Sequence, residues 1–181
     1  MFQRIEAPTA KTLRDGRCVS IRPLAEDDGP PLLAFGRSLP MDDWQYLEED
    51  LQRPEIITRL VNAHLAENWR QVVAVTDEGE IVGYSAVRRL AGWSNHVGDI
   101  QLIVSDRWRR SGLGTALAEA VFDAARDLGV AKVIVEVLER QTGGVAIFER
   151  LGFHIEGSLS DHARDRAGRH HNLIVLAYHI A

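Results

Sequence analysis

One seven-residue segment limits the folds open to this chain more than any other. It runs from Arg109 to Thr115 and reads Arg-Arg-Ser-Gly-Leu-Gly-Thr. An apolar run typical of a strand, Ile100–Val104, precedes it, and residues 115–128 follow with the apolar spacing of a helix. Two glycines let the backbone turn tightly and bring its N–H groups close to a ligand. The first turn of a helix adds free N–H donors and the positive end of the helix dipole. The segment therefore predicts a phosphate-binding turn between a strand and a helix, in an α/β chain.

The rest of the chain alternates between strand-like and helix-like patterns, with no internal repeat or low-complexity tract. We expect strands at residues 19–24, 71–75, 81–87, 100–104, 132–138, 153–159 and 172–180, and helices at 29–39, 54–65, 115–128 and 144–151. Residues 1–12 read as a loose N-terminal arm. Residues 13–181 are expected to form one domain, because their length suits a single core and no linker interrupts them.

Charge and hydropathy narrow the classes of partner. The chain has 21 Lys and Arg residues against 26 Asp and Glu residues, a net charge of -5. A nucleic-acid partner is not expected, because general nucleic-acid binders need a basic surface. Residues 1–6 lack the apolar core of a signal peptide, and no apolar run is long enough to span a membrane. We therefore expect a cytoplasmic protein without a membrane partner.

Three kinds of phosphate site compete for the glycine turn. A P-loop requires lysine after the final glycine, but Thr115 follows Gly114. A dinucleotide site requires a third small residue, where this chain has Leu117, although Glu136 lies at a plausible distance for the acidic residue of that motif. Two arginines also separate the strand from the glycines. The remaining interpretation is a coenzyme A site.

That interpretation rests on a resemblance that covers nearly the whole chain. The order Arg109-x-x-Gly112-x-Gly114, after a strand and before a long helix, resembles the GNAT superfamily of N-acetyltransferases. Three further segments resemble that family: Leu13–Gly16 with Ile21–Leu24, then the strand Val133–Val137, then Gln141 with Ala146–Phe153. The resemblance implies an α/β (α+β) fold with a mixed, mostly antiparallel sheet of about seven strands. The sheet would splay between its fourth and fifth strands and carry helices on both faces.

The resemblance also implies a set of residues that bind acetyl-CoA as cosubstrate, without a metal. Backbone groups of Leu102, Ile103 and Val104 would align the pantetheine arm. The pyrophosphate would lie on the turn, and the arm would also meet two residues after the fifth strand. The implied contacts with the turn and with those two residues involve Arg109, Arg110, Ser111, Gly112, Leu113, Gly114, Thr115, Gln141 and Phe148.

Two carboxylates are candidates for the general base that removes a proton from the acceptor amine. Glu136 is the first choice, since it interrupts an apolar strand, where burial would raise its pKa. An outward-facing strand residue is the alternative interpretation of Glu136. Asp99 and His96, before or within the fourth strand, are rivals. The acidic segments Asp42–Asp43 and Glu48–Asp50 would lie along the acceptor cleft or form a solvated face.

The chain departs from the family pattern at two positions. Gln141 stands where members commonly carry Asn, which contacts the cofactor arm. Glutamine keeps the amide group but carries it on a longer side chain. Phe148 stands where many carry Tyr, whose hydroxyl protonates the leaving thiolate. The acid is therefore unassigned, and the sequence alone does not place Tyr84 or Tyr178.

The resemblance predicts an acetyl-CoA-dependent N-acetyltransferase acting on a primary amine by direct attack, with a protein amine and a small-molecule amine both open. The alternative is a non-catalytic acyl-CoA-binding or regulatory module. A homodimer is possible. Three histidines near the C-terminus lack a defined ligand spacing and read as solvated loop residues, namely His162, His170 and His171.

Overall fold

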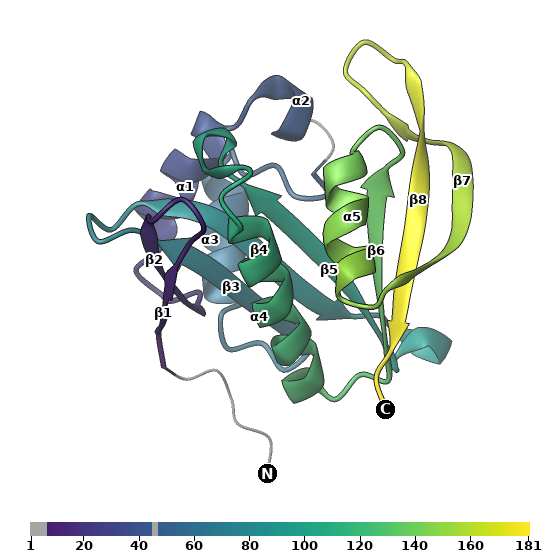
Figure 1. Ribbon diagram of the computed structural model, residues 1–181, viewed down its shortest axis with the longest axis horizontal. Helices are drawn as coiled ribbons and strands as arrows, with labels where there is room; N and C mark the ends of the chain where they lie inside the picture. Colours follow the sequence, from purple (N-terminus) through teal and green to yellow (C-terminus); the bar gives the residue numbers. More distant parts are fainter. Residues whose placement is uncertain (1–6, 45–46) are drawn as a thin grey trace.

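The computed structural model describes residues 7–44 and 47–181, which form a mixed sheet flanked by helices (Figure 1). The strands are β1 Thr9–Thr12, β2 Cys18–Pro23, β3 Trp69–Val75, β4 Ile81–Arg89, β5 Val97–Val104, β6 Lys132–Leu138, β7 His154–Arg164 and β8 His170–His179. Their order across the sheet is β1-β2-β3-β4-β5-β6-β8-β7, and every neighbouring pair is antiparallel except β5 with β6. This confirms the expected mixed, mostly antiparallel sheet.

The helices lie on both faces of the sheet, as expected. They are α1 Gly29–Ser38, α2 Met41–Trp44, α3 Pro54–Asn62, α4 Leu113–Leu128 and α5 Thr142–Arg150, and two single 3₁₀ turns occur at Gly92–Ser94 and Asp106–Trp108. α4 and α5 share one core with Val133, while α1 and α3 pack against Val73 on the opposite face. None of the described helices is long and apolar enough to cross a membrane.

Part of the loose N-terminal arm expected at residues 1–12 is a strand. Residues 9–12 are not loose, because β1 pairs with β2 from Thr9↔Ile21 to Thr12↔Cys18. This strand raises the expected seven to eight in the described part of the chain. All four β1 residues are exposed, so no buried face produces an alternating apolar pattern that would mark a strand. Residues 1–6 of the expected arm lie outside the described residues.

Leu117 shows how closely α4 lies on the sheet. Its side chain is fully buried, and a Cβ placed on Gly83 of β4 would stand 2.5 Å from the Leu117 Cδ1 atom. The small residue that permits close helix–strand packing is therefore on the strand, whereas dinucleotide folds place it on the helix. This geometry supports the rejection of a dinucleotide site.

Candidate active site

The parallel pair β5–β6 opens along its length. Register pairs run only from Val97↔Lys132 to Ile100↔Val135, after which β5 continues to Val104 and β6 to Leu138 without pairing to each other. Figure 1 shows the two strands together at one end and diverging towards α5. The expected splay between these strands is thus confirmed.

Backbone groups of β5 face this opening. The Leu90 N–H donates to the Val97 carbonyl at 2.9 Å, and the Ser105 N–H donates to the Val82 carbonyl at 2.9 Å. These two bonds show which residues of β5 direct their backbone groups towards β4. Because antiparallel ladders alternate, the backbone groups of Leu102 and Val104 point away from β4 and into the opening. Those of Ile103 point towards β4. Of the three residues expected to align the arm, two present free backbone groups there.

The glycine turn joins this opening to α4. Its backbone has positive φ at Arg110 (58°) and Gly112 (92°), and α4 begins at Leu113. The buried Ser111 hydroxyl donates to the Trp108 carbonyl at 2.5 Å and accepts from the Leu113 N–H at 3.3 Å. Both hydrogen bonds of the Ser111 hydroxyl thus lie inside the turn. The predicted contact of Ser111 with phosphate is therefore left to its backbone N–H group.

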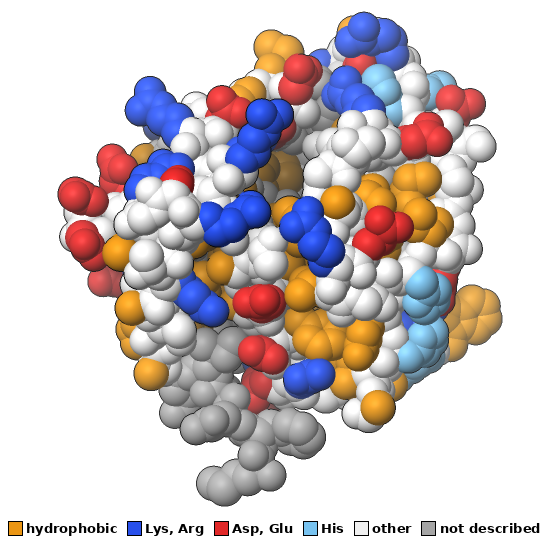
Figure 2. All heavy atoms as spheres, in the orientation of Figure 1, with side chains coloured by type: hydrophobic (Ala, Val, Ile, Leu, Met, Phe, Trp, Pro, Cys, Tyr) orange, Lys and Arg blue, Asp and Glu red, His pale blue; other side chains and the backbone are white. Residues whose placement is uncertain are grey.

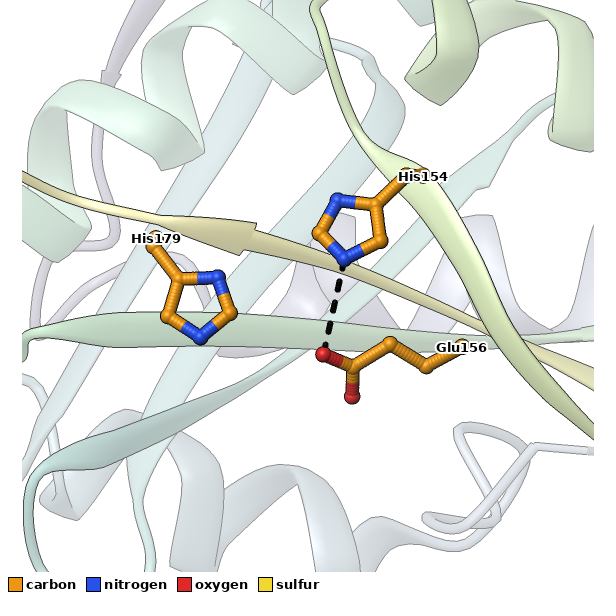
Figure 3. Close-up of side chains that lie close together, drawn as sticks. All are labelled: His154, Glu156 and His179. Atoms are coloured by element: carbon orange, nitrogen blue, oxygen red, sulfur yellow. Dashed lines mark ion pairs between the residues drawn. The ribbon is translucent and has the colours of Figure 1, made fainter.

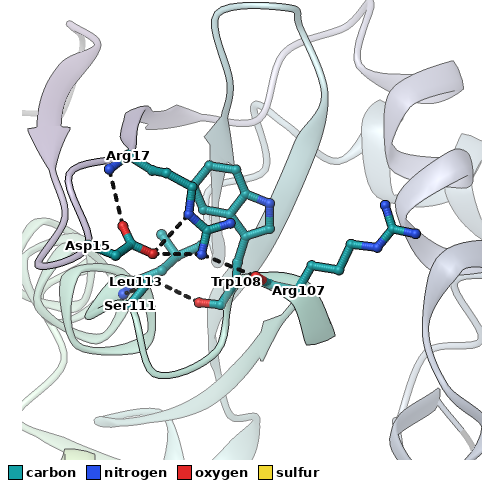
Figure 4. A network of polar contacts seen from close by, with 6 residues as sticks. All are labelled: Asp15, Arg17, Arg107, Trp108, Ser111 and Leu113. Atoms are coloured by element: carbon teal, nitrogen blue, oxygen red, sulfur yellow. Dashed lines mark hydrogen bonds and ion pairs between the residues drawn. The ribbon is translucent and has the colours of Figure 1, made fainter.

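A segment far away in sequence braces the turn (Figure 4). The Arg17 guanidinium lies 3.9 Å from the centre of the Trp108 ring and donates to the Arg107 carbonyl at 3.1 Å. Asp15 pairs with Arg17, and the Arg14 N–H donates to the Ser111 carbonyl at 3.0 Å. Sequence reasoning noted the segment 13–16 only as a family resemblance. It missed this bracing role, since 90 residues separate Arg17 from Arg107.

The two arginines of the turn differ in their partners. Arg109 pairs with Asp43, which follows the start of α2, and with Asp106 at 3.2 Å. Arg110 is exposed, and no carboxylate among the described residues pairs with it. Figure 2 shows Lys and Arg side chains around the hollow between α2 and α5. Arg110 is therefore the arginine of the turn whose charge is available to an anion.

The two candidate bases lie in different surroundings. Asp99 is half-buried in the paired part of β5, and burial raises its pKa to about 7, with the negative charges of Glu136 and Glu48 adding to the rise and Arg88 opposing it. Glu136 is exposed, which agrees with the alternative interpretation of an outward-facing strand residue and not with the expected burial. A carboxylate with a pKa near neutrality is suited to general base catalysis. Asp99 fits that description better.

Asp99 opens onto a pocket on the α1–α3 face of the sheet. The pocket has a volume of about 260 Å³ including solvent at its mouth, and is lined by Glu48, Glu49, Trp69, Ala86, Arg88, Asp99 and Gln101. The Glu48 carboxylate accepts from Arg88 at 2.8 Å and from the Gln101 amide at 2.6 Å. Part of the predicted acidic wall, Glu48 and Glu49, therefore lines this pocket, while Asp43 pairs with Arg109 instead.

Phe148 and Tyr84 lie in the core, and Tyr178 is partly buried against it. Phe148 is 3% exposed and its ring packs 5.1 Å from that of Phe153, which in turn contacts Tyr178. Tyr84 is also buried, its hydroxyl donates to the Gln71 side chain at 2.8 Å, and burial raises its pKa further above the usual range. These contacts show structural roles for the three rings.

Two other predicted residues are exposed. Gln141 stands immediately before α5, and its N–H donates to the Leu138 carbonyl at 2.8 Å. Its side chain is exposed to solvent at the open end of β6. The His96 side chain is exposed, and its carbonyl accepts from the Ala131 N–H at 2.8 Å. His96 therefore has a backbone role at the closed end of the β5–β6 pair.

Comparison with known proteins agrees with this geometry. The model of the acetyltransferase (GNAT) family matches residues 33–153. The chain is 25% identical over 100 residues to an L-methionine sulfoximine/L-methionine sulfone acetyltransferase of Pseudomonas paraeruginosa, covering 54% of this chain and 58% of that protein. It is 29% identical over 102 residues to an N-alpha-acetyltransferase of Sulfurisphaera tokodaii, covering 50% and 60%. The chain thus matches less than two thirds of the length of these curated relatives.

Solved structures share the fold over most of the chain. An acetyltransferase of the GNAT family from Streptococcus pneumoniae has a TM-score of 0.78 at 22% identity, covering 90% of this chain and 99% of that one. A putative acetyltransferase from Salmonella typhimurium with its cofactor acetyl-CoA has a TM-score of 0.78 at 14% identity, covering 90% and 94%. At these identities the likeness concerns the fold.

Proposed function

Since the chain belongs to the GNAT family of acetyltransferases, we propose that its residues 13–181 act as one domain that transfers an acetyl group from acetyl-CoA to a primary amine. The amine attacks the thioester directly, without a covalent acetyl-enzyme. The observation that carries this proposal is the position of Asp99, whose pKa is raised to about 7 beside an opening lined by free backbone groups. A proton acceptor and a binding edge for an extended ligand thus lie on the same strand.

The residues around the opening fit the shape and charge of coenzyme A, which supplies an acetyl group activated as a thioester. Leu102 and Val104 present backbone N–H and C=O groups to the extended arm, as an unpaired strand does. At the end of β5, free N–H groups of the turn and of the first turn of α4 bind the pyrophosphate. Arg110 adds a charge that no described carboxylate neutralises.

Asp99 is the general base in this proposal. Its ionised carboxylate accepts the proton that the acceptor ammonium must lose before the nitrogen can attack. The nearby Glu136 tunes Asp99, because its negative charge raises the pKa of the Asp99 carboxyl. Glu48 and Glu49 give the pocket a negative wall, which favours a cationic amine over an anionic acceptor. Both a protein amine and a small-molecule amine are compatible with this pocket.

A thiol-release assay tests the proposal. The untagged protein is incubated with acetyl-CoA and a panel of amines that includes free amino acids and peptides with free N-termini. We expect thiol release with at least one amine, at a rate that rises as the pH passes about 7 because Asp99 must be ionised to accept a proton. Tight acetyl-CoA binding without release from any amine would instead support the non-catalytic acyl-CoA-binding alternative.

A further inference from the structure

Three side chains that commonly bind metals meet on the surface of the β7–β8 pair, away from the glycine turn. His154 and Glu156 lie near the start of β7, and His179 ends β8. The His154 Nε2 atom is 3.5 Å from the Glu156 Oε1 atom, and one ligand atom from each of the three residues lies within 4.8 Å of the others (Figure 3). Two imidazoles and one carboxylate therefore converge on one small volume.

The local backbone brings these side chains together. His154 pairs with Ala177, two residues before His179, so both histidines occupy the same face of the sheet. The register skips Glu156, since Ile155 pairs with Leu176 and Gly157 with Val175. Such a bulge re-aims the side chain of the extra residue. Here the bulge accompanies a Glu156 carboxylate that points at the two imidazole rings (Figure 3).

We propose that His154, Glu156 and His179 bind a divalent transition-metal ion of the Zn²⁺ type. Zinc binds imidazole nitrogen and carboxylate oxygen at about 2.0–2.2 Å, so the donor atoms of a tetrahedral site stand about 3.3 Å apart. The separation of 3.5 Å between His154 and Glu156 already matches that value. The ligand atoms lie within 4.8 Å of one another, so bringing His179 into the same shell needs a side-chain movement of at most about 1.5 Å. Imidazole ligands favour Zn²⁺ or Cu²⁺ over Mg²⁺ or Ca²⁺, and solvent completes the exposed site.

Lys132 is the competitor of the metal. Its ammonium group lies 2.6 Å from the Glu156 Oε2 atom, and its residue pairs with His179 across β6 and β8. A metal ion at the cluster repels this cation and takes over part of its carboxylate partner. Lys132 contacts Oε2 while His154 faces Oε1, so the carboxylate can serve both, but the repulsion remains and removal of the Lys132 charge should tighten metal binding. A cluster held together solely as an ion pair predicts no such gain.

The metal site is separate from the proposed acetyl-transfer site. The register connects His154 to Ala177, Ala177 to Ile134, and Ile134 to Asp99, which places the cluster three strands from Asp99. At a strand spacing of about 4.8 Å this is about 14 Å. The metal proposal can therefore be tested independently of acetyl transfer. A bound ion would link the start of β7 to the end of β8 and stabilise this edge of the sheet.

The β7–β8 hairpin offers a matched control. Figure 2 shows histidine side chains both at the hairpin tip and near its other end. At the tip, the His171 Nε2 atom lies 3.0 Å from the Asp165 Oδ2 atom, while His162 and His170 are exposed. In the described part of the chain, no group of three metal ligands includes any of these tip histidines. His170→Ala removes an exposed imidazole without touching the proposed site.

The test is a Zn²⁺ titration of the untagged, metal-free full chain by calorimetry, with thermal unfolding as a second readout. We expect one ion per chain, binding at least 10-fold weaker in His179→Ala, unchanged in His170→Ala, and several-fold tighter in Lys132→Gln. Zinc should raise the unfolding temperature of the wild type and of His170→Ala, but not of His179→Ala. Circular dichroism of each variant confirms folding. Equal zinc affinity in the wild type and His179→Ala, or an equal loss in His170→Ala, would overturn the proposal, as would undetectable binding in both the wild type and Lys132→Gln.

Discussion

The two halves of the β5–β6 pair offer different chemistry although they belong to the same two strands. In the paired half, residues 97–100 and 132–135 use their facing backbone groups to bind each other. In the open half, residues 101–104 and 136–138 do not pair with each other, and Leu102 and Val104 turn their backbone groups into the opening. The paired half can therefore contribute side chains, and Asp99 is the one that we propose as the base. The open half contributes backbone, and its side chains at Leu102 and Val104 are apolar.

Under the proposed function, this division would let one strand hold a cosubstrate and a base at the same time. The ladder on both sides fixes the position of Asp99, so its carboxylate does not need a network of side-chain partners. A ligand in the open half replaces a missing strand, and its main contacts depend little on side-chain identity. Function in the two halves should therefore respond to different kinds of mutation.

The largest expected effect is that of Asp99→Asn in the paired half. An amide accepts no proton, so we expect kcat to fall by about 100-fold or more, in the range typical of lost general base catalysis. The affinity for acetyl-CoA, measured by calorimetry, should change less than about twofold, because that ligand uses the open half and the turn. The pH dependence of kcat near pH 7 should disappear with the carboxylate.

Glu136→Gln is the matched control, because Glu136 stands just beyond the last β5–β6 pair. Removing its negative charge should lower the pKa of Asp99 and move the rise in kcat to lower pH, with a change of only a few-fold at pH 8. If Glu136→Gln lost as much activity as Asp99→Asn, the base would be Glu136, as the sequence indicated first, and the division between the halves would fail.

Two glycines at opposite ends of α4 give the next test. Gly112 and Gly129 both have positive φ, 92° and 72°, so alanine at either position should cost about 1 kcal/mol or more of unfolding free energy. Only Gly112→Ala distorts the N–H groups of the turn, and we expect it to weaken acetyl-CoA binding about 10-fold. Thermal unfolding and calorimetry measure the two effects. Equal affinity in both variants would remove the turn from the binding site.

The sequence predicted much of this arrangement, because its strongest signals are local. The glycine turn, the end of α4 at Leu128 and the order of seven strands along the chain follow from short patterns, although α4 begins at Leu113, two residues before the expected start. Glu136 shows where a local pattern misleads. In β6, Val133, Val135 and Val137 are buried against α4 and α5, whereas Glu136 faces the other side of the sheet and is exposed. An apolar run suggests two covered faces, but one face of this strand is partly open.

Contacts between distant segments were beyond the reach of sequence patterns. β1 has four exposed residues and therefore no apolar signal, yet its backbone extends the sheet. The stacking of Arg17 on Trp108 joins parts of the chain with no shared motif. The pKa of Asp99 is raised first by burial and then by the charges of Glu136 and Glu48, and only the folded chain buries Asp99 and brings these three carboxylates together.

Arg110→Gln should have a smaller effect on acetyl-CoA binding than Gly112→Ala. Water and salt screen the attraction between the exposed guanidinium and the cofactor phosphates. We therefore expect acetyl-CoA binding to weaken about 3-fold at low ionic strength and less at 0.5 M salt. Arg109→Gln should weaken binding less, because Asp43 and Asp106 already neutralise Arg109. Calorimetry at two salt concentrations measures both. A larger loss in Arg109→Gln would mean that acetyl-CoA displaces the Asp43 pair.

Asp99→Asn should also change stability, and this effect tests the paired half without any substrate. The pKa of Asp99 is about 7 in the folded chain and about 3.8 in the unfolded chain, so the folded chain binds more protons between these values. Stability from this group is therefore present below pH 4 and is lost as the pH rises towards 7. Asn at this position stays neutral and avoids the loss. The unfolding temperature of Asp99→Asn should accordingly exceed that of the wild type by a margin that grows between pH 4 and 7 and then levels at about 3 °C or more. Comparing the wild type with Asp99→Asn cancels the contribution of the titrating groups that do not interact with Asp99. A margin independent of pH would show that Asp99 keeps an ordinary pKa, and the paired half would then hold no base suited to neutral pH.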